Sequence, residues 1–184
     1  MVLECDNVFK STAEDAADEY FTQEAEQALR PRIVVKASNQ SRTNSTVLTN
    51  DTELFMSLSA QCTYEFELIF LCSTNNSYTP GIKATFTGPT GSTGYFYVDD
   101  FDVGVASDNY WYNTISGVVG ILYITALTDT ITGAAIDDTF GTRVRGWIKT
   151  GNTTGNLQFQ FAQDVSNANS TTVYAGSYLK VTRQ

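Results

Sequence analysis

Apolar and polar residues alternate along most of the chain after residue 31. In residues 64–72, one face of the pattern carries four large apolar side chains, Tyr64, Phe66, Leu68 and Phe70. The other face begins with two glutamates and ends with Ile69 and Leu71. Successive side chains of a strand point to opposite faces of a sheet. The pattern therefore predicts a strand that starts half exposed and ends buried on both faces.

Similar runs recur at regular spacing, and turn-forming residues such as Thr79-Pro80-Gly81 separate them. Residues 38–44 are expected to form a loop. Strands are predicted over 32–36, 47–48, 54–58, 82–87, 94–101, 118–127, 142–150, 156–162 and 177–182. We therefore expect residues 32–184 to form an all-β domain, an antiparallel β-sandwich or jelly roll of about eight strands.

Residues 11–29 follow a different pattern, because their apolar positions recur at the period of a helix. Pro31 ends this pattern, since proline disfavours helical geometry in the residue before it. Much of the apolar stripe is alanine, and Tyr20 and Phe21 are its bulkiest members. The sequence predicts one N-terminal α-helix in an arm of residues 1–31. We expect its stripe to pack against the β-domain or against a neighbouring subunit.

The chain is acidic, with 20 acidic and 11 basic residues and a net charge of −9. This balance argues against general nucleic-acid binding, which needs basic groups to neutralise phosphates. Six of the acidic residues lie within residues 14–26, where there is no lysine or arginine. We interpret this cluster as the solvated face of the helix; the alternative is a negative tether for a basic partner surface.

The segments that direct a chain to a membrane are not recognisable here. The first ten residues lack a basic stretch followed by an apolar run, so no signal peptide is expected. No window of about 20 apolar residues is present, so no membrane span is expected. The cysteines Cys5, Cys62 and Cys72 are odd in number. Cys62 and Cys72 lie at the two ends of one predicted strand, too far apart for a disulfide, and are expected to be buried thiols.

The sequence offers few candidates for catalysis. There is no histidine, which removes the Ser-His-Asp and Cys-His arrangements and the usual zinc sites. Asp100-x-Asp102-x-Gly104 matches only the start of a calcium loop, so ordinary surface acids are the favoured interpretation. We expect no enzymatic activity, no catalytic or metal-binding residues and no cofactor.

Three adjacent aromatic residues, Tyr110, Trp111 and Tyr112, form the most unusual cluster. They cannot all face one core from a strand, because neighbouring side chains alternate between faces. Two interpretations stay open with equal weight: Trp111 caps the core with the tyrosines at its rim, or the cluster lies in a subunit interface. A sugar-binding surface is a third and weaker possibility.

The segment from Tyr64 onward resembles a module that recurs in virion proteins of tailed bacteriophages and prophages. The resemblance rests on "YEFE", on "IKATFTGPTG", and on "RVRGWIKTGNTTGNLQFQFAQDVSNANSTTVYAGSYLKVTRQ". The preceding "RIVVKASNQSRTNSTVLTNDTELFMSLSA" is similar to the opening strands of the module. The whole resemblance covers residues 32–184, with a poor match over residues 95–140. The resemblance implies a virion structural protein, and it brings no catalytic residue with it.

This resemblance suggests a use for the stretch "LQFQFAQD" at residues 157–164. Its outward face would carry Gln158 and Gln160 and little charge, which would suit a symmetric contact between copies. Virion sandwiches of this kind commonly assemble as trimers, so the resemblance implies a homotrimer. The contact is a hypothesis and requires this face to be covered in the assembled state.

Taken together, these features predict a capsid decoration, or cement, protein that stabilises the phage head as a trimer. It would be made in the host cytoplasm and located in the virion. Its partners would be itself and the major capsid protein or another virion protein, with no nucleic acid and no membrane. The alternative is a tail or fibre component with a receptor- or glycan-binding role. Candidate interface residues are Tyr20, Phe21, Tyr110, Trp111, Tyr112, Gln158 and Gln160.

Overall fold

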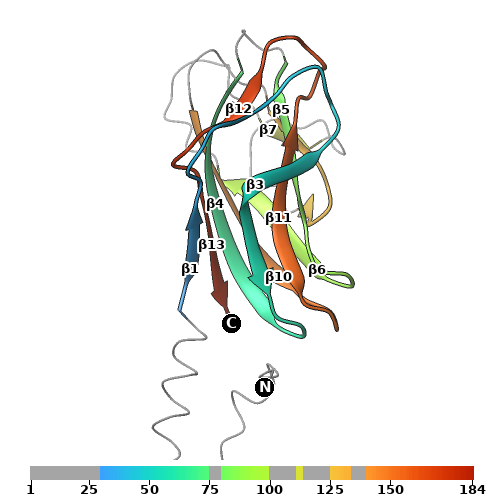
Figure 1. Ribbon diagram of the computed structural model, residues 1–184. Coiled ribbons are helices and arrows are strands. Elements are labelled where there is room, and N and C mark those ends of the chain that lie inside the picture. The colour runs from blue at the N-terminus through green and yellow to red at the C-terminus, as the bar shows by residue number, and fades with distance from the viewer. Residues whose placement is uncertain (1–29, 75–79, 100–110, 114–124, 134–139) are drawn as a thin grey trace, which may run out of the picture.

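The computed structural model describes residues 30–74, 80–99, 111–113, 125–133 and 140–184 (Figure 1). Within these ranges every regular element is a strand, and every strand pair is antiparallel. The all-β prediction is therefore confirmed for the described residues. The helix expected over 11–29, including Tyr20 and Phe21, lies outside them.

The strands form two sheets. The larger sheet has the order β1 (Arg32–Val35), β13 (Tyr178–Arg183), β4 (Thr63–Thr74), β10 (Phe140–Lys149), β6 (Thr93–Asp99) and β8 (Thr125–Ala126). It is extended by β12 (Thr171–Val173), which pairs with β4 and with β2 (Gln40–Arg42). The smaller sheet has the order β3 (Thr49–Leu58), β11 (Gly155–Ala162), β5 (Ile82–Thr87), β9 (Ile131–Gly133) and β7 (Trp111–Asn113).

The two sheets pack face to face through phenylalanine rings. Phe66 of β4 lies 4.9 Å from Phe86 of β5, measured between ring centroids. Phe70 of β4 lies 5.2 Å from Phe159 of β11, and Phe86 lies 5.3 Å from Phe96 of β6. All five rings are buried. The inward face predicted for 64–72 is confirmed, because these rings belong to a single core between the sheets.

The long strands agree with the sequence pattern to within a few residues, whereas several short ones do not. Residues 38–44 were expected to form a loop, but they contain β2, which pairs with β12 through Thr171↔Arg42. That prediction is wrong because the pairing comes from a distant strand and not from local apolar residues. The described residues hold more than eight strands. Since several connections run through other residues, the jelly-roll topology stays a prediction.

The two cysteines that the structure describes differ in their bonding state. Cys72 is a buried free thiol, as expected, and burial raises its pKa well above the ordinary value. Cys62 takes part in a disulfide bond, so the expectation of a free thiol is wrong for this residue. Cys5 lies outside the described residues.

Candidate binding face

The outward side chains of the larger sheet form a face that we call the outer face. Pairing across strands sets its rows, because register partners in a sheet point to the same side. In one row Glu67 of β4 lies between Lys180 of β13 and Arg145 of β10, and Tyr97 of β6 follows Arg145. In the next row the order is Thr182, Glu65, Trp147 and Tyr95.

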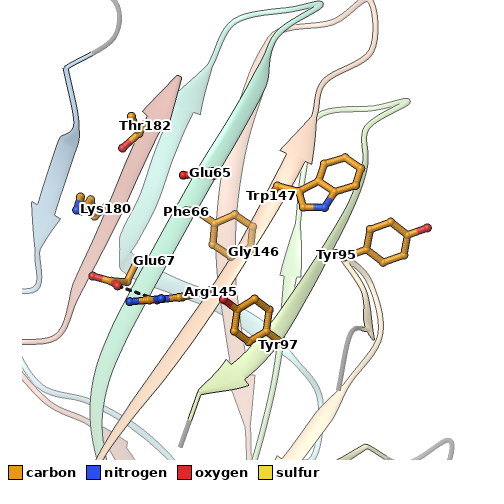
Figure 2. A pocket seen from close by; sticks show the side chains of 10 residues that line it. All are labelled: Glu65, Phe66, Glu67, Tyr95, Tyr97, Arg145, Gly146, Trp147, Lys180 and Thr182. Atoms are coloured by element: carbon orange, nitrogen blue, oxygen red, sulfur yellow. Dashed lines mark hydrogen bonds and ion pairs between the residues drawn. The ribbon is translucent and has the colours of Figure 1, made fainter. Parts of the chain in front are cut away.

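A groove with a volume of about 430 Å³ runs over these two rows. Figure 2 shows Glu67 and Arg145 near its middle, with Trp147 and Tyr95 on one side and Lys180 on the other. The lining side chains stand on neighbouring strands of one sheet, so their positions are fixed by backbone pairing. The groove is therefore built on a rigid platform and not on loops.

An ion network occupies the centre of the outer face. Glu67 Oε2 accepts hydrogen bonds from Arg143 Nε at 2.9 Å and from Arg145 Nε at 3.2 Å. Glu67 Oε1 accepts a hydrogen bond from the Tyr178 hydroxyl at 3.1 Å. Burial alone would raise the pKa of Glu67, but the Tyr178 hydrogen bond and the two arginines outweigh it, and the net pKa is lowered. Glu67 is therefore a fixed carboxylate that holds both arginines in place.

Arg145 links this network to the next strand. A hydrogen bond with Tyr97 is the largest cause of its raised pKa, and Glu67 adds to the effect. By contrast, Glu65, Lys180 and Thr182 make no side-chain hydrogen bond or ion pair with any residue that the structure describes. The groove thus combines a fixed ionic centre with polar groups that are available to another molecule.

Exposed apolar side chains flank this centre on both sides. Tyr95 and Trp147 are 45% and 40% exposed, with ring centroids 5.3 Å apart and planes inclined at 60°. On the opposite margin, Ile33 and Val35 of the edge strand β1 are each 58% exposed. Large apolar side chains gathered on one face are typical of a surface that another molecule covers. The outer face is accordingly our candidate for the functional surface.

The side chains of the outer face are arranged in a way that suits binding. Among the described residues, no three histidine, cysteine or acidic side chains lie close enough together to hold a metal ion. Glu67, the best-placed carboxylate, is already held by two arginines and a tyrosine. With these partners the pKa of Glu67 is lowered and its charged form is stabilised, which suits it to holding the two arginines in place.

Gln158 and Gln160, predicted to form a contact between copies, both make hydrogen bonds within the chain. Gln158 is only 8% exposed, and its amide donates to the backbone carbonyls of Asp51 at 2.8 Å and Phe159 at 2.9 Å. Gln160 is partly exposed and donates to the Asn50 side chain at 2.7 Å. The amide of Gln158 is therefore occupied within the chain. A contact between copies through this face stays a prediction, and Gln160 is the member of the pair that is available for it.

The predicted aromatic cluster is only partly within the described residues. Trp111 and Tyr112 belong to β7, the edge strand of the smaller sheet, and pair with Gly133 and Thr132 of β9. They are thus on a different sheet from the groove. Tyr110, like Tyr20 and Phe21, lies outside the described residues, so the interface roles of these aromatic residues stay predictions.

Sequence reasoning missed the residues of the groove. Arg143, Arg145 and Trp147 occupy alternate positions of one strand, and Tyr95 and Tyr97 do so on another. Such spacing places each set on one face of its strand, and this could have been predicted from the sequence. The meeting of the two sets depends on the register Arg145↔Tyr97 and Trp147↔Tyr95, which a single sequence does not reveal.

Known proteins resemble this chain only weakly. No family model and no curated protein sequence matches the chain. The solved structures that it resembles include the infectious bursal disease virus Gx strain, with 13% identity and a TM-score of 0.20 over 84% of this chain and 40% of that chain. They also include the VP2 subviral particle of that virus, with 13% identity and a TM-score of 0.21. The chain spans 42% of that VP2 chain.

Both neighbours come from the same virus, but TM-scores of 0.20 and 0.21 carry no argument for a shared fold or function. In the part of the chain that the structure describes, no helix is long and apolar enough to span a membrane.

Proposed function

We propose that the protein is a non-enzymatic structural protein of a bacteriophage virion, and most specifically a capsid decoration protein that assembles as a homotrimer. The residue pattern of 32–184, which resembles a phage virion module, supports the virion role. The observation that carries the proposal is the outer face, where a fixed ionic centre lies between two exposed apolar margins.

A surface of this kind is suited to burial against another protein. The apolar margins gain free energy when they leave water. The central charges are already paired within the chain, so covering them costs less than covering isolated ions. In this proposal β1 and its neighbours form the contact between copies, and the arm of residues 1–31 attaches the trimer to the major capsid protein or to another virion protein.

The contact between copies is tested by replacing one exposed valine. Val35→Asp places a charge on the outer face, and we expect it to convert trimers to monomers in sedimentation velocity experiments. Val165 is the matched control, because it is 53% exposed but lies outside the larger sheet, and Val165→Asp should leave the trimer intact. A wild-type protein that sediments as a monomer at micromolar concentration would contradict the trimer.

The location is tested by cryo-electron microscopy of the intact virion. We expect density for the sandwich at three-fold or quasi-three-fold positions of the capsid shell. Density at the tail or neck alone would contradict the decoration role and would favour a tail component.

One observation favours that second candidate, a receptor- or glycan-binding tail component. Tyr95 and Trp147 expose their rings beside Glu65, whose side chain has no described partner. Sugars bind where an apolar ring face meets side chains that can hydrogen-bond hydroxyl groups. Binding to host-surface glycans on an array that is lost in Trp147→Ala but kept in Phe55→Ala would support it. Phe55 is a suitable control because it is 41% exposed on the smaller sheet.

A further inference from the structure

A lysine and an aspartate meet inside the domain, away from the outer face. Lys36 follows β1, and its Nζ lies 2.9 Å from Asp51 Oδ1 and 2.9 Å from Asp51 Oδ2. Both side chains are 0% exposed. Lysine and aspartate are almost never fully buried unless they are paired, and keeping both charges away from water has a large desolvation cost. The site therefore brings an amine and a carboxyl group together in a dry environment.

The two oxygens of Asp51 have different surroundings. Oδ1 accepts hydrogen bonds from the backbone N–H groups of Glu53 and Leu54, each at 2.9 Å. Oδ2 is buried and accepts no hydrogen bond from any described residue, although Nζ is within ion-pair distance. Two backbone donors aimed at one oxygen can stabilise negative charge that develops there. The other oxygen is the one that is chemically less constrained.

A second carboxylate stands beside the amine. Glu53 Oε1 lies 3.6 Å from Lys36 Nζ, and the Glu53 side chain is 24% exposed, so it connects the site to solvent. The backbone N–H groups of Ala37 and Ser38 hold it there at 2.6 Å and 3.2 Å. Glu53 is thus positioned to accept a proton from Nζ and to pass it on.

The backbone around Lys36 is also fixed. Its N–H donates to the Ser177 carbonyl at 2.8 Å, and its carbonyl accepts from the Gly176 N–H at 2.9 Å. Nζ additionally donates to Gln40 Oε1 at 3.3 Å. An amine and a carboxyl group held this way react as if each were present at a very high concentration.

We propose that Lys36 and Asp51 join spontaneously in an intramolecular amide bond. The amine, once it has given a proton to Glu53, attacks Asp51 Cγ, and the new N–C bond forms. The charge that develops on Oδ1 is stabilised by the N–H groups of Glu53 and Leu54. Two of the three protons of the ammonium group end on Oδ2, which leaves as water when the C–O bond breaks. Glu53 carries these protons and is unchanged at the end, so the reaction needs no other reactant.

The product fits the site better than the ion pair does. Two buried charges are replaced by a neutral amide, which removes their desolvation cost. The amide oxygen keeps both backbone donors, and the amide N–H lies beside Gln40 and Glu53. The bond would covalently tie the segment after β1 to β3, and hence the larger sheet to the smaller one.

Mass spectrometry of the reduced, denatured full-length protein tests the proposal. We expect a mass about 18 Da below that of the sequence, because one water molecule is lost. Trypsin should fail to cleave after Lys36 and should yield residues 33–42 joined to residues 43–83, with fragment ions that place the link at Lys36 and Asp51. An unmodified mass together with cleavage after Lys36 would overturn the proposal and leave a buried ion pair.

Variants distinguish the Lys36–Asp51 amide bond from other reactions that also remove one water molecule. Lys36→Arg should restore the full mass, whereas a succinimide at Asp51 would persist in that variant and would overturn the proposal. Lys180→Arg is the matched control and should still show the loss, because Lys180 lies on the outer face. Glu53→Gln should leave most of the protein without the link. Peptide mapping of the wild-type chain decides the question even if a variant fails to fold.

Discussion

At the scale of single residues, Gly146 leaves no room for a side chain between β10 and the Phe66 ring. A Cβ atom added there would lie 2.5 Å and 2.7 Å from two ring carbons of Phe66, and would also collide with the Tyr95 carbonyl oxygen. Gly146→Ala should therefore lower the free energy of unfolding by about 1–3 kcal/mol, the usual cost of overpacking. Urea denaturation measures this change.

The control for this prediction lies on the same strand. A Cβ added at Gly141 would meet only a Leu71 methyl group, at 3.4 Å, which is an ordinary contact. Gly141→Ala should change stability by less than about 0.5 kcal/mol. Equal effects of the two substitutions would mean that the loss reflects glycine itself and not the contact with Phe66.

Glu67 should make stability depend on pH in the acid range. Its pKa is lowered in the folded protein, so its pairing stabilises the fold above the unfolded pKa of about 4.3 and is lost as pH falls through the lower folded pKa. Glu67→Gln removes this contribution. The difference in unfolding free energy between wild type and Glu67→Gln should therefore shrink as pH falls from 7 to about 3.

Thermal unfolding of both proteins across this pH range is the measurement. Other groups cancel in the difference between the two proteins, including Asp164, whose pKa is raised by burial. A difference that is constant with pH would show that Glu67 acts through packing and not through its charge.

At the scale of elements, the pairing of β3 with β11 is interrupted between Gln158 and Gln160, where the register shifts. The Gln158 amide satisfies the Asp51 and Phe159 carbonyls at this irregularity. Gln158→Ala leaves these buried acceptors unpaired and should cost about 1–3 kcal/mol of unfolding free energy. Gln160→Ala breaks only an exposed side-chain hydrogen bond and should cost less than about 0.5 kcal/mol. Chemical denaturation compares the two, and similar losses would contradict a special role for Gln158.

The long strands were predictable because their pattern is local. The predicted strand 82–87 is identical to β5, and β1, β4, β10, β11 and β13 match their predictions closely. Each has enough alternating residues for period two to stand out. β6 was expected over 94–101 and is described over Thr93–Asp99. β8 falls within the predicted strand 118–127, whose first seven residues lie outside the described part of the chain.

Features that depend on distant pairing were not predictable. β2 and β12 have three residues each, and they exist because β12 pairs with β4 on one side and with β2 on the other. The burial of Gln158 depends on the register shift against β3, which alternation alone does not reveal. The Lys36–Asp51 pair likewise joins two segments whose contact appears only in the folded structure.

At the scale of the whole molecule, one core unites the two sheets. The Phe86 ring contacts Phe66, Phe96 and Phe159, which belong to three other strands in both sheets. Phe86→Ala should reduce the unfolding free energy by about 3–5 kcal/mol, the usual cost of removing a buried phenylalanine. Phe55→Ala, at an exposed position on the smaller sheet, should have little effect.

A shared core also predicts how the domain unfolds. Secondary structure and tertiary packing should be lost in one transition, so far-UV and near-UV circular dichroism should give the same midpoint for wild type and for Phe86→Ala. Two separate transitions would mean that the sheets are independently stable and that the core does not couple them.

The pairing of β1 with β13 has a mechanical consequence. The two strands are antiparallel with Arg32 opposite Val181, so the start of β1 and the end of β13 lie at the same end of the sheet (Figure 1). A force that pulls residue 32 away from the sandwich would load the hydrogen bonds one after another, as in a zipper. Such a pull would first break the pairing of β1 with β13 and would then reach the fully buried ion pair of Lys36. Tension on the arm would thus end at Asp51 and be transmitted into the smaller sheet.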